Sequence, residues 1–141
     1  YFEQGGKRYS HTLDPQAGNP VICAAGHALL EQLTPIMLEH VVDAGHVLGD
    51  MCEELLAQFP EWVKAVRGIG MLRTVELADA DTAARFHREA LGHGLLLAPP
   101  SPGSPVITAS PPLIMAETEV RRGVDLMAAV FLEWSDRSVC L

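Results

Sequence analysis

Lysine, aromatic residues and long apolar runs are scarce in this sequence, and these scarcities exclude several classes of protein. Aromatic residues make up 6% of the 141 residues, while 48% are apolar and 20% are charged. This balance is typical of a globular chain and not of a disordered one. The longest apolar runs are far shorter than the ~20 residues that cross a bilayer, and the first residues show no signal pattern. We expect a single globular domain in the cytoplasm, with no membrane partner.

Positive charge is also scarce, which bears on the partners that the chain can bind. Ten Lys and Arg residues face 18 Asp and Glu residues, and the net charge is −8. An acidic surface repels the phosphate backbone of DNA and RNA. The few basic residues are scattered along the sequence, so we expect no nucleic-acid partner.

Residues that could hold a metal ion lack the spacing that a metal site needs. The three cysteines, at positions 23, 52 and 140, form no ligand motif, and we interpret them as reduced core thiols. Among the six histidines, His27 has Glu31 one helical turn away, but zinc would require a third ligand. The sequence therefore predicts no metal site.

Two helices are expected near the start of the chain, each opened by the same device. Asn19 is a good N-cap and is followed by Pro20, and Thr34-Pro35 repeats the pattern. We predict helices over about 20–33 and about 36–59, the second of them long and amphipathic and ended by Pro60. Residues 1–18 contain several glycines and a proline without a sustained period, and they are predicted to form a loop or extended arm.

The remaining residues mix strand and helix patterns. We predict strands at 71–77, 95–97 and 106–109, and helices at about 82–92 and 117–134. Gly68 and Gly70 are explained by a tight turn that leads into a strand, and no dinucleotide motif is needed. The predicted fold is α+β, with two N-terminal helices followed by β-α-β-β-α and a small three-stranded sheet with helices packed on one face. Within one structural domain, we divide the chain into an arm (1–18), interdomain and long amphipathic helices (19–59) and a small α+β part (60–141).

Five segments, taken in order and with their spacing, resemble a known enzyme family. They are His11-Thr12, Ala17–Gly26, Val66–Leu77, Gly94–Leu97 and Ser110–Ile114. From about Thr12 to Trp134 the chain resembles the C-terminal portion of the class III pyridoxal-phosphate aminotransferases and aminomutases, enzymes of fold type I. The resemblance implies a small aminotransferase-like domain in a homodimer. It also implies amino-group transfer to or from a small amine or amino acid through lysine-bound pyridoxal phosphate.

Thr12 is the cofactor-binding residue that the resemblance implies. In the family, a threonine shortly before the Gly-Asn-Pro helix start donates its hydroxyl to the cofactor phosphate, commonly that of the neighbouring subunit, and a hydroxyl suits a phosphate oxygen. Here Asn19 stands seven residues beyond Thr12, where about four is usual, and Asp14 adds a negative charge. An ordinary solvated loop threonine remains the alternative.

Two other positions depart from the resembled pattern. Family members that bind an α-carboxylate often carry an arginine three residues before the Pro-Pro pair, because a guanidinium matches a carboxylate bidentately. Thr108 occupies that place, and the neutral Ala98 stands near another position where arginine is frequent. Either the substrate is held differently or the site is degraded.

The cofactor lysine is the residue whose absence matters most. Pyridoxal phosphate forms a Schiff base with a lysine amine, and the chain has only Lys7 and Lys64. Neither stands in the family's lysine setting, so we predict no catalytic residue within this chain. The lysine is expected upstream of Tyr1, in a cofactor-binding large domain, or on a separate polypeptide. The alternative is a non-catalytic or degenerate aminotransferase-like domain that acts as a protein-interaction or regulatory module.

Overall fold

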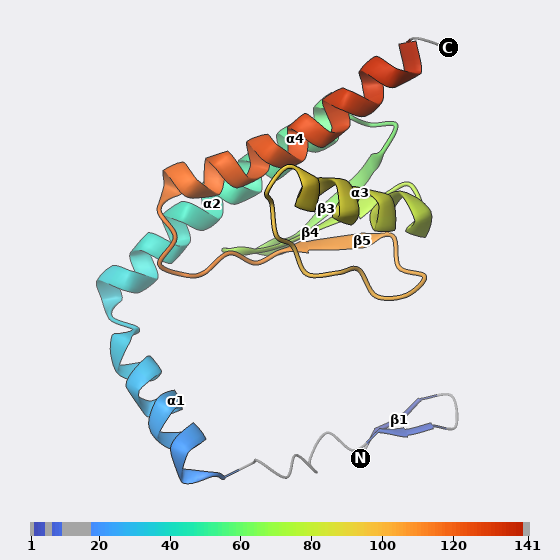
Figure 1. The fold of residues 1–141 in the computed structure, drawn as a ribbon. Coiled ribbons are helices and arrows are strands. Elements are labelled where there is room, and N and C mark those ends of the chain that lie inside the picture. Colours follow the sequence, from blue (N-terminus) through green and yellow to red (C-terminus); the bar gives the residue numbers. More distant parts are fainter. Residues whose placement is uncertain (1, 5–6, 10–17, 140–141) are drawn as a thin grey trace. The chain divides into compact units, whose positions relative to one another are not determined.

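The computed structural model describes residues 2–4, 7–9 and 18–139. The chain divides into two compact units, residues 1–37 and 38–141. Figure 1 shows the helices and strands that they contain. No single helix in the described ranges is long and apolar enough to span a membrane. Helices α1 and α2 reach that length and composition only when they are taken together across the break between them.

The first unit contains a strand pair and one helix. Strands β1 (Phe2–Gln4) and β2 (Lys7–Tyr9) pair antiparallel, within the residues that we expected to form a loop or arm. Strands of three residues are too short to leave a periodic pattern in the sequence. Helix α1 (Pro20–Gln32) begins as predicted, because Asn19 Oδ1 accepts a hydrogen bond of 2.9 Å from the N–H of Val21.

Helix α2 (Pro35–Gln58) confirms the predicted long amphipathic helix and provides one wall of the core. The Thr34 hydroxyl accepts a 3.3 Å hydrogen bond from the N–H of Met37, which caps the first turn. The buried residues of α2 recur at three- and four-residue spacing, as one helical face requires. They are Ala44, Gly45, Leu48, Gly49, Cys52 and Leu55.

Three antiparallel strands form the sheet of the second unit, in the order β3-β4-β5. They are β3 (Val63–Ile69), β4 (Leu72–Leu77) and β5 (Val106–Ala109). Gly68 has φ +132°, and a Cβ there would lie 2.1 Å from the Leu72 carbonyl oxygen, so the β3–β4 turn requires glycine. This confirms the tight turn predicted for this glycine pair.

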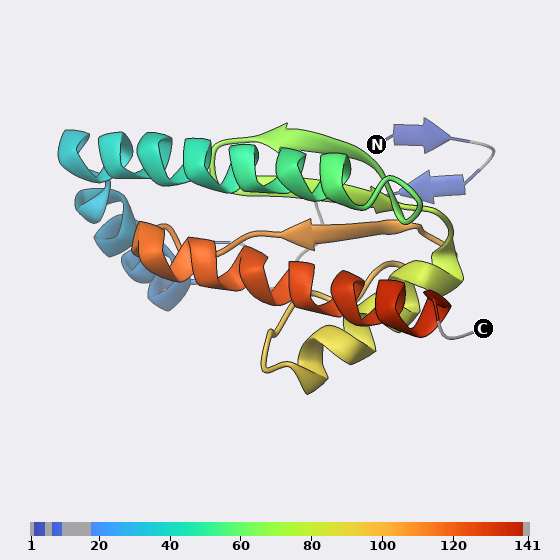
Figure 2. The ribbon, with the colours of Figure 1, turned by 90° about the horizontal axis from the view of Figure 1, so that it is seen from above.

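Helices α3 (Ala80–Gly92) and α4 (Glu117–Val139) complete the second unit. Figures 1 and 2 show α2 and α4 running along the same face of the sheet. The α+β class and the three-stranded sheet are thereby confirmed. The element order, however, is β-β-α-β-α, where β-α-β-β-α was predicted.

The predicted order differs in two places. Leu95–Leu97 was predicted as a strand but is an irregular segment, and strand β3 was not predicted. Strand β3 was hard to find because Lys64, Arg67 and Gly68 interrupt its apolar alternation. The leucines at 95–97 are apolar for another reason: they line a cleft, as shown below. Apolar runs this short do not distinguish a strand from a cleft wall.

An aromatic cluster closes the core where α3 meets α4. Phe86 and Phe131 stack with ring centroids 4.8 Å apart, and Phe131 and Trp134 lie nearly perpendicular with centroids 5.5 Å apart. The Trp134 indole N–H donates to Glu89, and the Arg85 guanidinium lies 4.2 Å from the centre of a Trp134 ring. The cluster therefore joins the two helices by packing, by a hydrogen bond and by a cation–π contact.

A glycine pair lets α2 approach the sheet closely. A Cβ on Gly45 would lie 2.6 Å from backbone atoms of Gly70, and one on Gly49 would lie 2.6 Å from the Arg73 guanidinium. Arg73 fills the space over these glycines and donates to the carbonyl oxygens of Gly68 (2.9 Å) and Gly45 (3.2 Å). Gly45 must therefore stay small because it meets backbone, whereas a Cβ on Gly49 would displace the Arg73 guanidinium.

Candidate functional site

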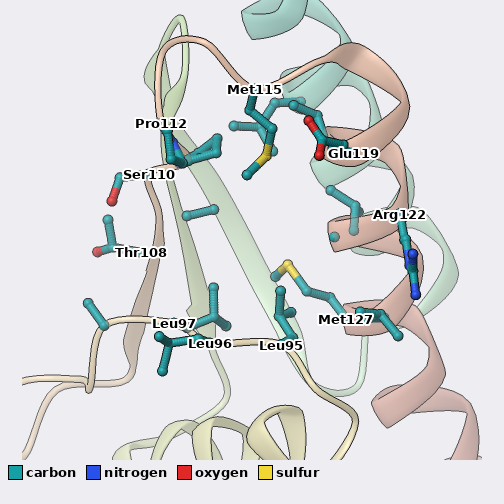
Figure 3. A pocket seen from close by; sticks show the side chains of 18 residues that line it. Leu95, Leu96, Leu97, Thr108, Ser110, Pro112, Met115, Glu119, Arg122 and Met127 are labelled. Carbon is teal, nitrogen blue, oxygen red and sulfur yellow. The ribbon is translucent and has the colours of Figure 1, made fainter.

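An apolar cleft opens in the second unit between the end of β5, the segments 95–98 and 110–115, and helix α4. Its volume is about 370 Å³. Figure 3 shows side chains of Leu95, Met115 and Met127 directed into it. Leu48 of α2 and Val124 of α4 are buried and also belong to its walls. Such a cleft favours apolar groups, because their transfer from water removes apolar surface from solvent.

Two histidines fix the segments that border the cleft. His87 Nε2 donates to the carbonyl oxygen of Leu97 over 3.1 Å, and His40 Nε2 donates to that of Met115 over 3.0 Å. The two accepting residues are both lining residues. The histidines therefore anchor these two segments to α2 and α3.

Charge at the cleft comes from α4. Glu119 and Arg122 lie on its border, and Glu119 Oε2 accepts a 3.0 Å hydrogen bond from the N–H of Ala116, which caps the helix start. We did not single out Arg122 from the sequence. Its only signal was an arginine three residues after Glu119, a common spacing on the solvated face of a helix.

Thr108 and Ala98, the two neutral positions singled out in the sequence, both border this cleft. Figure 3 shows the hydroxyls of Thr108 and Ser110 directed away from its centre. Across the sheet Thr108 pairs with Thr74, and next to Thr74 lies Arg67, which forms an ion pair with Glu76. The structure therefore brings these two positions together but places no guanidinium at either of them.

Of the two lysines and Thr12, only Lys64 has a side chain that the structure describes. Lys64 is exposed, and its Nζ donates to the carbonyl oxygen of Pro60 over 2.8 Å at the end of α2. Lys7 lies in β2. Thr12 lies outside the described residues, so its predicted role stays a prediction. Lys64, the one lysine within residues 18–139, is thus a surface residue that supports a helix end.

No group of three or more metal-ligating side chains gathers within the described ranges. His27 Nδ1 lies 3.5 Å from Glu31 Oε1, and both side chains are largely exposed on α1. An exposed pair of this kind is a surface feature.

The cysteines only partly match the sequence prediction of core thiols. Cys52 is buried, and burial raises its pKa to about 11, although Arg73 partly opposes the rise. At neutral pH this thiol is protonated and a poor nucleophile. Cys23 is exposed on α1, so the prediction of a core thiol is wrong for this residue. Its apolar neighbours on α1 are not buried within the described residues either.

Residues 38–141 form a small α+β domain that has a core of its own and an apolar cleft. The family model described as aminotransferase class-III matches residues 11–131. The chain belongs to the class III aminotransferases.

Relatives and solved structures agree with this assignment. The chain is 37% identical over 114 residues to the acetylornithine aminotransferase of Thermosynechococcus vestitus, and 33% identical over 113 residues to that of Synechocystis sp.. These matches cover 79% and 78% of the chain, but only 27% and 26% of the relatives. The crystal structure of acetylornithine aminotransferase from Elizabethkingia anophelis matches with a TM-score of 0.74 and 26% identity. This match covers 90% of the chain and 32% of the Elizabethkingia enzyme. The chain thus spans about a quarter of the length of these curated relatives.

Proposed function

We propose that this chain is the C-terminal segment of a class III aminotransferase that transfers an amino group through a lysine-bound pyridoxal phosphate. The lysine and most of the cofactor site belong to polypeptide outside the chain. The observation that carries this proposal is the combination of a family match over residues 11–131 with coverage of only 27% of a relative. Because the chain spans about a quarter of its relatives' length and has no suitably placed lysine, we infer that it is one part of a longer enzyme.

The described residues do not by themselves fit pyridoxal phosphate. The cofactor needs an amine that is held beside it and an acidic partner for its ring nitrogen. Lys64 is exposed and bonded to Pro60, and the acidic residue nearest the cleft, Glu119, caps α4. The chain is therefore inactive alone, and the amine and the acidic partner belong to polypeptide outside it.

Within the complete enzyme, the chain's own contribution is to shape the substrate entrance. Thr108 and Ala98 are neutral, so an α-carboxylate finds no bidentate partner at either position. Thr12 remains our candidate for a hydroxyl donated to the cofactor phosphate. The substrate is a small amine or amino acid, the enzyme is a cytoplasmic homodimer, and neither nucleic acid nor a membrane takes part.

The test separates the chain from its partner. Purified chain is mixed with pyridoxal phosphate, reduced with borohydride and mapped by mass spectrometry. We expect no stable adduct on the chain alone, and an adduct on a partner lysine when the chain is combined with a cofactor-bearing aminotransferase portion. The Lys64→Arg variant is the matched control and should behave like the unaltered chain. A cofactor imine that forms at Lys64 in the isolated chain would refute the proposal.

A second candidate function has one observation in its favour. Residues 38–141 form a compact unit with a core of their own, which is what a stand-alone interaction or regulatory module requires. The two candidates differ in one outcome. A regulatory module binds its partner without restoring amino-group transfer, whereas the enzyme segment restores it.

A further inference from the structure

Strand β5 is an edge of the sheet, and its outer side carries main-chain groups that the described residues leave unpaired. The sheet order is β3-β4-β5. The N–H of Leu77 donates to the Pro105 carbonyl over 2.8 Å, which marks this pair as a hydrogen-bonded one. Bonded and non-bonded pairs alternate in an antiparallel ladder. With Val75 opposite Ile107 and Thr74 opposite Thr108, the main chain of Ile107 therefore faces β4.

The same alternation turns the N–H and C=O of Val106 and Thr108 outward. The N–H of Val106 is already bonded to the Ser104 hydroxyl over 3.2 Å, which agrees with this assignment. No described residue bonds the main chain of Thr108. An edge with a free donor and acceptor is a template for another strand.

The free edge coincides with the apolar cleft. Thr108, Ala109 and Ser110 line its border, and its interior is formed by Leu95, Met115 and Met127 (Figure 3). The rim adds exposed apolar side chains, with Leu96 81% and Ile114 80% exposed. An apolar small molecule would use only the interior. An extended peptide would use both features, because its backbone can bond the edge while alternate side chains enter the cleft.

We propose that β5 and the cleft receive an extended aliphatic segment of the polypeptide that carries the cofactor-binding part of the enzyme. The inference rests on the proposed function for the source of that segment, since the relatives are about four times longer than the matched region. The segment pairs with Thr108 and places aliphatic side chains against Leu95 and Met127. It thereby adds a fourth strand to the sheet and covers the apolar cleft.

Gly123 offers a variant that blocks the cleft without weakening the fold. It lies on α4 among the lining residues, and a Cβ there would meet only Leu95 Cδ1, at 4.0 Å. Gly123→Leu replaces a poor helix former by a good one and fills the cleft. Gly123→Ala is the matched control, because it improves the helix in the same way and leaves the cleft open.

A second pair of variants tests the strand pairing. Thr108→Pro removes the outward N–H, and proline is accepted on edge strands where the N–H faces away from the sheet. Thr108→Val keeps the N–H and has nearly the same shape. The contrast between the two variants isolates the main-chain hydrogen bond from the side chain.

The experiment uses the full chain and overlapping synthetic peptides that cover the unmatched part of the Thermosynechococcus acetylornithine aminotransferase. We expect one peptide with alternating aliphatic residues to bind and to protect the Thr108 amide from hydrogen exchange. Gly123→Leu should weaken this binding by more than about tenfold and Thr108→Pro by about tenfold, while Gly123→Ala and Thr108→Val stay within about twofold. Failure of every peptide to bind would overturn the inference, as would binding that Gly123→Leu leaves unchanged.

The outcomes also separate this inference from the proposed function. Peptide binding supports the docking site, and the enzyme segment is refuted if the chain restores no amino-group transfer when it is combined with the cofactor-bearing aminotransferase portion. Restored transfer without any strand at β5 does the reverse. Peptide binding that fills the cleft but leaves the Thr108 amide unprotected would refute the strand pairing.

Discussion

Helices α1 and α2 start alike and differ in what they bury. Each is opened by a capping side chain followed by proline, and each carries many apolar residues. Yet no residue of α1 is buried, with Leu30 68% exposed, whereas Leu55 of α2 is 2% exposed. The comparison teaches that caps and proline decide where a helix begins, while only tertiary contacts decide whether its apolar face is covered.

The largest difference is expected from matched leucine truncations. Leu55→Ala leaves a cavity in the core and should lower the free energy of unfolding by about 2–5 kcal/mol. Leu30→Ala should change it by less than about 0.5 kcal/mol, since an exposed side chain loses little on truncation. Urea denaturation of the isolated chain measures both. Equal effects of the two truncations would show that the apolar face of α1 is covered in the isolated chain.

The two thiols provide the next contrast. Burial raises the pKa of Cys52 from 9.0 to about 11, which alone reduces its thiolate about a hundredfold. Cys23 is exposed. We expect iodoacetamide to label Cys23 at least about a hundred times faster than Cys52 at neutral pH, as followed by peptide mapping. Comparable labelling in urea is the control, and comparable rates in the native chain would contradict the buried position of Cys52.

Glycine substitutions should change stability in opposite directions in the two helices. Gly45→Ala drives a Cβ against the Gly70 backbone at 2.6 Å and should cost about 1–3 kcal/mol through overpacking. Gly26→Ala meets nothing within 4 Å and should stabilise α1 by up to about 1 kcal/mol through helix propensity. Circular dichroism during thermal unfolding reports both signs. Stabilisation by Gly45→Ala would mean that α2 lies farther from the sheet turn than the structure shows.

The smallest expected effect is a change in the stability of the second unit at acid pH, and it depends on Glu89. Burial by itself raises the pKa of Glu89, but hydrogen bonds from Arg85 and Trp134 outweigh it and hold the pKa below 4.5. A carboxylate with a lowered folded pKa contributes stability that is fully present above its unfolded pKa. That contribution is lost as the pH falls through the folded pKa.

Glu89→Gln should therefore destabilise the chain slightly at neutral pH and flatten the decline of stability below pH 4.5. Unfolding midpoints measured across the acid range check this expectation. Glu31→Gln on α1, where the exposed carboxylate lies 3.5 Å from His27 Nδ1, is the control. An acid profile that Glu89→Gln leaves unaltered would show that the Trp134–Glu89 bond is not formed in solution.

Much of the fold could be predicted from local signals. The caps at Asn19 and Thr34 and the four-residue spacing in α2 gave both leading helices to within a residue or two, and five ordered segments indicated the family. Strand β3 was missed because polar residues and Gly68 break its alternation. Segment 95–97 was mistaken for a strand because a run of three leucines looks the same in a strand and in a cleft wall.

The candidate site was less accessible from sequence than the fold. Thr108 and Ala98 were singled out through the family pattern, but nothing local showed that they border one cleft. The anchoring histidines were not singled out from the sequence, although His40 reaches a carbonyl 75 positions away. Contacts of that kind leave no periodic trace, because they depend on how separate elements pack.

The sequence by itself determined where the helices begin, that the chain carries excess negative charge, and that it has only two lysines. These features depend on residue identity and on neighbours within one or two helical turns. Only the tertiary structure decided that Gly45 must be small, that Cys52 is inert while Cys23 is accessible, and that β5 ends as a free edge beside an apolar cleft. Each of these properties depends on contacts between atoms that are distant along the chain and meet only when the helices pack on the sheet. Packing depends on the shape and burial of side chains, which cannot be read from the order of residues alone.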